Sequence, residues 1–150
     1  MNPREIAQWM REEHAAVEEL ADKIGARVAA IPRVGLAAWI SETAAHLEAF
    51  HRHLCRHFEL EQEGGYLEAV TDRSPALSPD VDRLRHEHDE IDRILTAIHR
   101  DLVAATEQDR IITEDCCCRL QNLLRYLRDH EEREDLMMIS AFTNDLGTKD

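Results

Sequence analysis

Hydrophobic residues recur along four stretches of the chain at alternating steps of three and four, which is the period of an amphipathic α-helix. The stretches run from residue 2 to about 31, from about 34 to 64, from 78 to about 106, and from between 107 and 113 to about 142. No alternating pattern typical of a β-strand competes with them. Four such helices with short connections predict an all-α fold, an up-down-up-down antiparallel four-helix bundle.

Local signals delimit these helices. Asn2-Pro3 combines a capping residue with a proline at the first helical position, and Pro32 ends the first helix. Gly64-Gly65 is a typical end for the second. A short helical turn is expected at residues 66–70, followed by the longest loop at residues 71–79. Residues 1–143 are predicted to form one domain and residues 144–150 a frayed C-terminal tail.

Six ionisable residues occupy positions on the apolar faces where hydrophobic side chains are expected. Each helix contributes at least one of them: His14, His57, Glu61, His88, His130 and Glu134. Burying an unpaired carboxylate is strongly unfavourable, and a buried imidazole also needs a partner. One buried histidine is an ordinary feature of a protein core. Six such groups facing one interior indicate a common partner that compensates all of them.

The six residues also repeat between the two halves of the chain. The offsets are 88 − 14 = 74, 130 − 57 = 73 and 134 − 61 = 73. In an antiparallel bundle, the C-terminal ends of the second and fourth helices lie level with the N-terminal ends of the first and third. The six groups are therefore predicted to converge in one layer. Four imidazoles and two carboxylates suit two transition-metal ions, with iron, manganese or zinc as candidates.

Composition narrows the range of partners. The chain has 31 acidic and 18 basic residues, so its net charge is −13. This charge argues against binding to nucleic acid or to an anionic membrane surface, and no apolar run is long enough to cross a membrane. Three of the four cysteines are adjacent at residues 116–118, which suits disulfide pairing poorly. A reducing cytoplasm is therefore the expected location.

Four segments carry a resemblance to a known family. Residues 13–14, 53–66, 87–91 and 130–134 read EH, HLCRHFELEQEGGY, EHDEI and HEERE. They resemble the hemerythrin-like domain, also called the HHE cation-binding domain, and the resemblance covers nearly the whole chain. It implies a non-haem di-iron centre with an oxo or hydroxo bridge, carboxylate bridges, and histidine ligands from all four helices. On this basis the metal ligands would be His14, His57, His88 and His130 at terminal positions, with Glu61 and Glu134 as bridges.

The chain departs from the oxygen carriers of that family at two places. Those proteins have a second histidine one turn before the ligand of the third helix, where this chain has Leu84. They also tend to space the fourth-helix pair as His-x-x-x-x-Asp, whereas His130 and Glu134 are four residues apart. The family's iron-centre repair proteins carry an additional cysteine-bearing segment that this chain lacks. These departures argue against a specialised oxygen-carrier role.

The resemblance leaves three functions open. The first is a cytoplasmic di-iron protein that binds O2, NO or a related small oxidant as a sensor, store or redox-protective factor. The second is an enzyme that turns over peroxide or NO or supports iron-centre repair. The third is an interaction module that uses metal only to fold. The sequence names no catalytic residue and does not specify the metal used in the cell, the physiological ligand or the oligomeric state.

Other polar residues have open roles. His53 lies at the edge of the second apolar face, as an additional ligand or a half-exposed residue, and His86 would be a ligand only if the third helix were rotated. Tyr126, one turn before His130, is either a donor to a bound oxygen species or a packing residue. The remaining histidines are expected at the surface: His46, His51 and His99.

Glu18 and Asp92 each follow a candidate ligand by four residues, at matching places in the two halves. They are either hydrogen-bond acceptors for the ligand imidazoles or part of the solvated surface. Cys116 is expected in the core, although a redox role for residues 116–118 stays open. Met137 and Met138 are expected to pack in the core.

Overall fold

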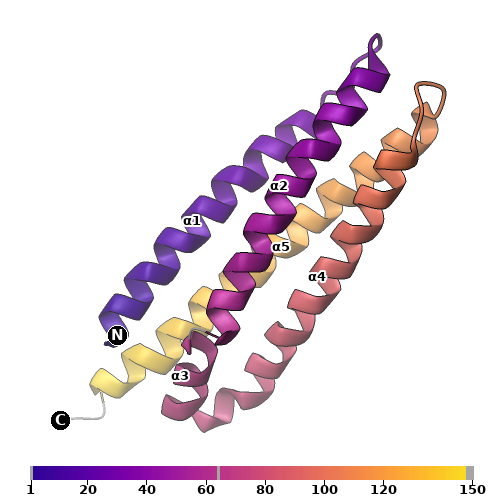
Figure 1. Cartoon of the computed structure of the whole chain (residues 1–150). Helices are drawn as coiled ribbons and strands as arrows, with labels where there is room; N and C mark the ends of the chain where they lie inside the picture. The colour runs from indigo at the N-terminus through magenta and orange to yellow at the C-terminus, as the bar shows by residue number, and fades with distance from the viewer. Residues whose placement is uncertain (1, 64, 148–150) are drawn as a thin grey trace.

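The computed structural model describes residues 2–63 and 65–147, and four long antiparallel helices form its body. Helix α1 packs against α2 and α5, and α4 packs against the same two neighbours, so the four surround one core (Figure 1). The described residues contain no strand. The predicted up-down-up-down four-helix bundle is therefore confirmed. The long helices are α1 (Pro3–Val28), α2 (Leu36–Glu63), α4 (Ser78–Ala104) and α5 (Arg110–Gly147).

The start of α1 follows its sequence signal. The side chain of Asn2 accepts a hydrogen bond from the Glu5 amide at 2.9 Å, and the Glu5 carboxylate accepts one from the Asn2 amide at 2.9 Å. This reciprocal pair satisfies two amide groups that the first helical turn leaves without partners. At its other end α1 stops at Val28, three residues before the predicted end.

The connection between α2 and α4 is more helical than predicted. Helix α3 (Tyr66–Arg73) continues past residue 70, and a short 3-10 helix, η1 (Pro75–Leu77), leads directly into α4. The predicted loop at residues 71–79 was therefore wrong. Pro75 and Pro79 lie in the first turns of η1 and α4, where the amide hydrogen that proline lacks has no helical partner. These prolines mark helix starts, and α3 closes one end of the bundle (Figure 1).

The core consists of two hydrophobic clusters on either side of the predicted polar layer. The larger cluster lies toward the α1–α2 and α4–α5 connections and includes Leu47, Leu95 and Leu120. The smaller one lies at the α3 end and includes Met10 and Leu67. The hydrophobic residues that recur at steps of three and four along the four predicted helices are buried, except Ala7, Ala21 and Ile31, which are half-buried.

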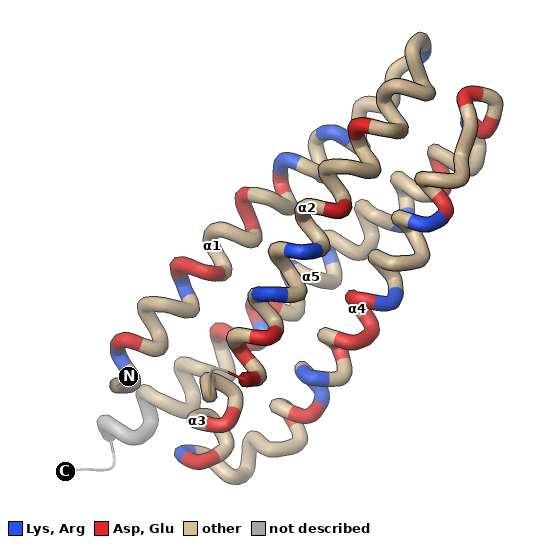
Figure 2. Tube along the Cα trace, viewed as in Figure 1, with Lys and Arg blue, Asp and Glu red and all other residues tan. Residues whose placement is uncertain are grey.

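Charged residues are distributed along the long helices, and acidic residues are interspersed with basic ones along α1, α2 and α4 (Figure 2). Within the described residues, no helix combines the length and the apolar character that crossing a bilayer requires. The backbone of α5 stays helical to Gly147, inside the predicted C-terminal tail, and residues 148–150 lie outside the described part.

Candidate metal centre

The six predicted ligands come together in one buried layer. Glu61 and Glu134 are 0% exposed, and the most exposed of the four histidines, His14, is 6% exposed. One histidine comes from α1 and one from α4, while α2 and α5 each supply a His-x-x-x-Glu pair. The two groups of this layer that could hold a metal ion are His14, His57 and Glu61, and Glu61, His88, His130 and Glu134.

Each glutamate faces histidines from both halves of the bundle. Glu61 contacts His57 and lies 3.7 Å from His14 Nε2 through Oε1, while its Oε2 lies 3.2 Å from His88 Nε2. A carboxylate whose two oxygens face different histidine pairs has the arrangement of a bridge between two ions.

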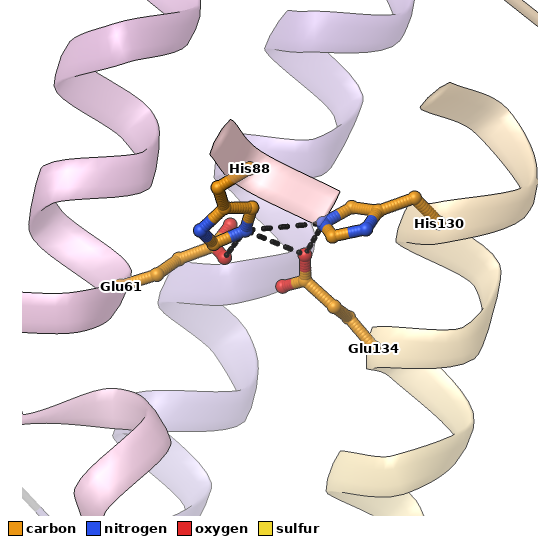
Figure 3. Close-up of side chains that lie close together, drawn as sticks. All are labelled: Glu61, His88, His130 and Glu134. Atoms are coloured by element: carbon orange, nitrogen blue, oxygen red, sulfur yellow. Dashed lines mark hydrogen bonds and ion pairs between the residues drawn. The ribbon is translucent and has the colours of Figure 1, made fainter. Parts of the chain in front are cut away.

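Glu134 is placed in the same way. Its Oε1 contacts His130 and lies 3.6 Å from His88 Nε2, and its Oε2 lies 3.6 Å from His14 Nε2. Figure 3 shows Glu61 and Glu134 converging on the His88 and His130 rings. Both glutamates therefore lie between the two histidine pairs.

The Nδ1 atoms of His57 and His130 face carboxylates on the neighbouring helix. Glu13 lies 3.4 Å from His57 Nδ1, and Glu87 lies 2.8 Å from His130 Nδ1. Glu87 is itself held by two hydrogen bonds from Arg133, at 2.8 and 2.9 Å. A carboxylate at Nδ1 fixes the proton there and leaves the Nε2 lone pair available for a metal.

The other two histidines have partners that directly follow the glutamates. Asp135 Oδ1 lies 2.8 Å from His14 Nδ1, and the Gln62 side-chain amide lies 2.6 Å from His88 Nδ1. All four Nδ1 atoms are therefore occupied on the outer side of the cluster, and all four Nε2 atoms contact the glutamates.

The inner atoms of the cluster lack ordinary hydrogen bonds. Within the described residues, His14 Nε2, His57 Nε2 and all four carboxylate oxygens of Glu61 and Glu134 are buried without a hydrogen-bond partner. In addition, His88 Nε2 and His130 Nε2 lie 3.1 Å apart. Glu87 holds the His130 proton at Nδ1, so the Nε2 lone pair of His130 is directed into the cluster. This donor set, nitrogen and oxygen only, fits a transition metal.

The cluster also favours positive charge electrostatically. Burial alone lowers the pKa of His14, but the carboxylates around it, Asp135 first, outweigh burial and raise the pKa to about 12. Glu134 and Glu61 similarly raise the pKa of His88 to about 9 against the effect of burial. Positive charge at neutral pH is then present as protons on the imidazoles or as metal ions that replace them.

Aromatic residues enclose the layer. The Phe58 ring stacks on His88 with centroids 3.9 Å apart and an interplanar angle of 12°. Tyr66 is buried, and its hydroxyl donates to the backbone carbonyl of Glu134 at 3.4 Å. These contacts pack aromatic rings against the His88 imidazole and against the backbone at Glu134.

A groove between α1 and α5 reaches one side of the layer. It has a volume of about 500 Å3, and its lining includes His14, Glu131 and Asp135. Glu131 is only 7% exposed, and burial raises its pKa to about 7 although His14 and His57 act in the opposite direction. A small molecule can therefore approach the His14 side of the centre from solvent.

The structure shows where three residues lie whose roles the sequence left open. Tyr126 is 69% exposed, so the suggested contact with a bound oxygen species is wrong. His86 pairs with Glu90 on the surface of α4. His53 is half-buried and lines a groove with Leu20 of α1.

The two acidic residues expected near the ligands have other partners. Glu18 lies 3.8 Å from Arg128, and Asp92 lies 2.6 Å from His51. The contacts to the ligand imidazoles come instead from four residues that the sequence analysis did not single out for that role: Glu13, Gln62, Glu87 and Asp135. Their common signal is adjacency, because each directly precedes or follows a predicted ligand in the sequence.

The cysteine and methionine positions agree with a packing role. Cys116 and Cys117 are buried, and Cys118 is exposed. Cys116 belongs to the larger hydrophobic cluster, while Met137 and Met138 belong to the smaller one. The predictions of core packing at Cys116, Met137 and Met138 are confirmed.

Comparison with known proteins supports the same reading. No curated protein and no solved structure matches the chain at a significant level. A family description does match, and it covers residues 5–142, which include all six predicted ligands. On that match, the chain belongs to the hemerythrin HHE cation-binding domain family.

Proposed function

We propose that this protein is a cytoplasmic non-haem di-iron protein that binds O2, NO or a related small oxidant as a sensor, store or redox-protective factor. The observation that carries the proposal is the set of buried, unpartnered nitrogen and oxygen atoms in the six-residue layer. His14, His57, His88 and His130 would be terminal ligands, and Glu61 and Glu134 would bridge. Bound iron would supply reversible electron transfer and open positions for a small ligand.

The surroundings of the layer support ligand binding rather than a purely structural site. Structural metal sites are closed by protein ligands, whereas reactive sites keep a position open. Here Glu61 and Glu134 both contact His14 of one histidine pair and His88 of the other. If the two glutamates are shared between two ions, each ion has fewer protein ligands than iron accommodates. The groove beside His14 gives solvent and small molecules a route to that side.

Metal analysis combined with absorption spectroscopy tests this function. Protein produced with adequate iron and purified without oxygen should contain about two iron ions per chain. Admission of air should produce near-ultraviolet charge-transfer absorption, and azide or NO should alter the spectrum. One ion or none in repeated preparations would reject the dinuclear centre.

Turnover separates the proposed role from the alternatives. An iron-loaded protein that consumes peroxide or NO at steady state would be an enzyme. A protein that retains zinc, shows no redox change and binds no small ligand would be a module that uses metal only to fold. The proposed role predicts ligand-dependent spectra without sustained turnover.

A further inference from the structure

A second group of metal-binding side chains lies outside the six-residue layer, between α2 and α4. His51 Nε2 is 2.6 Å from Asp92 Oδ1, and the Cys55 thiol donates to the same oxygen at 3.5 Å. One nitrogen, one sulfur and one oxygen atom therefore lie within 4.8 Å of one another. None of these three residues belongs to the six-residue layer.

The helices place this trio in a geometry that suits one small cation. His51 and Cys55 are four residues apart on α2, so they lie on the same face. Asp92 comes from α4, which runs beside α2 (Figure 1). A tetrahedral Zn2+ at about 2.0–2.3 Å from its ligands holds donor atoms roughly 3.3–3.8 Å apart. The Cys55–Asp92 separation falls in that range, and the His51–Asp92 contact needs to open by less than an ångström.

The other half of the bundle shows that the scaffold does not require this trio. The offset of 73 that relates His57 to His130 takes His51 to position 51 + 73 = 124 and Cys55 to 55 + 73 = 128. The offset of 74 that relates His14 to His88 takes Asp92 back to 92 − 74 = 18. These positions hold Leu124, Arg128 and Glu18, and the last two form an exposed pair at 3.8 Å.

The side chains of His51, Cys55 and Asp92 are partly exposed to solvent. The side chain of His51 is 21% exposed, that of Asp92 is 52% exposed, and Cys55 is half-buried. All three line a groove of about 970 Å3. A cation can therefore enter from solvent, and a water molecule has room to complete four-coordination.

We infer that His51, Cys55 and Asp92 bind a single Zn2+ ion, with water as the fourth ligand. On binding, the Cys55 thiol loses its proton to water as the zinc–sulfur bond forms, and two bonds to zinc replace the His51–Asp92 contact. Thiolate with imidazole and carboxylate is a zinc donor set, whereas the sulfur-free six-residue layer suits iron. The occupied site would fasten α2 to α4 beside the layer.

Cobalt titration of iron-loaded protein tests this inference. Co2+ is a spectroscopic substitute for Zn2+, and a thiolate ligand gives it an intense near-ultraviolet charge-transfer band that imidazole and carboxylate ligands do not produce. The band should saturate at about one Co2+ per chain, and one equivalent of Zn2+ should remove it. Zn2+ should also raise Tm, because it binds the folded state. The result is independent of the function proposed for the six-residue layer.

Matched variants identify the ligands. Cys55→Ser should abolish the band, whereas Cys118→Ser, which changes the exposed cysteine of α5, should preserve it. Asp92→Asn keeps the side-chain size and should weaken Zn2+ binding at least about tenfold. Unchanged far-ultraviolet circular dichroism establishes that each variant folds. Absence of the band at saturating Co2+, or its persistence in folded Cys55→Ser protein, would overturn the inference.

Discussion

Asp135 and Gln62 occupy equivalent positions in the two halves of the bundle, but one is a carboxylate and the other an amide. Each directly follows a buried glutamate, and each contacts the Nδ1 atom of a histidine on a neighbouring helix. The distances are 2.8 Å from Asp135 to His14 and 2.6 Å from Gln62 to His88. Because a carboxylate makes the imidazole a stronger electron donor than an amide does, the two proposed metal positions would be chemically unequal.

This inequality predicts opposite effects of two conservative substitutions. Asp135→Asn should weaken the His14 ligand and speed iron loss to a chelator about 10–100-fold. Gln62→Glu should strengthen the His88 ligand and slow that loss. The measurement is the rate of iron release from loaded protein at fixed chelator concentration. Glu132→Gln, which changes an exposed carboxylate of the same helix, is the control and should behave as the unmodified protein does. Equal rates in all variants would contradict the assigned roles.

Replacement of the proposed bridges should cost metal and metal-dependent stability together. Glu61→Gln and Glu134→Gln keep the side-chain volume but remove the charge that neutralises two cations. Each should reduce iron from about two ions per chain to one or none, and the rise in Tm that iron produces should disappear. Glu63→Gln, at an exposed position of the same helix as Glu61, should retain both. Similar small losses in all three variants would refute the bridging assignment.

The buried layer could be predicted from the sequence because the period of a helix determines which of its residues face the core. A side chain at a core position of a long regular helix has only one direction to point, so His57, Glu61, His130 and Glu134 were identified from spacing alone. All of them are buried in the structure. The short elements at residues 66–77 were less predictable, since proline marks both loops and helix starts.

The contacts to the Nδ1 atoms of the four histidines could not be predicted in the same way. Whether Glu13 or Glu18 contacts an imidazole depends on the rotation of α1 against α2 and α5, which no single-helix pattern specifies. Glu18 follows its histidine by one turn, which favours a contact along its own helix. The observed contacts instead run between helices, from Glu13 to His57 and from Asp135 to His14. The packing between helices therefore determines which acidic residues contact the imidazoles.

A helix glycine gives a prediction that does not involve metal. Gly25 lies in the last two turns of α1, and a Cβ atom there would meet Leu124 Cδ1 at 3.4 Å, an ordinary contact. Gly25→Ala should therefore raise the free energy of unfolding by about 0.5–1 kcal/mol, because alanine loses less backbone entropy on folding than glycine does. Chemical denaturation of the metal-free protein measures it. The larger, β-branched side chain of Gly25→Val should lose that gain, and a decrease with alanine would show that the α1–α5 contact cannot adjust.

The ion pair at the far end of the bundle predicts a pH dependence. Arg119 on α5 donates to Asp101 on α4 at 2.9 Å, and this hydrogen bond lowers the pKa of Asp101. A carboxylate whose pKa is lower in the folded state stabilises the fold above its unfolded pKa, and this contribution disappears as pH falls through the folded pKa. Asp101→Asn should therefore lower Tm slightly at pH 7 and leave it unchanged near pH 2.

Asp115→Asn is the control for that measurement. Asp115 also accepts from Arg119, at 3.1 Å, but within the same helix. It does not connect α4 to α5, so its loss should change Tm less. If Asp115→Asn lowers Tm as much as Asp101→Asn does, the ion pair between α4 and α5 contributes no more stability than an ion pair within α5.

Leu84 determines the final prediction. It is buried one turn before His88, in the apolar cluster that contains Tyr66, and it cannot coordinate a metal. We expect at least one iron to keep a position free for exogenous ligands, so the reduced protein should oxidise quickly in air and the oxidised protein should bind azide. Leu84→His should slow oxidation and weaken azide binding, because an imidazole would occupy that position. Leu84→Met and Leu84→Gln control for packing and for polarity, and neither should have this effect. Reversible O2 uptake by the unmodified protein, measured over repeated cycles of oxygenation and degassing, would contradict the predicted fast oxidation and favour a carrier.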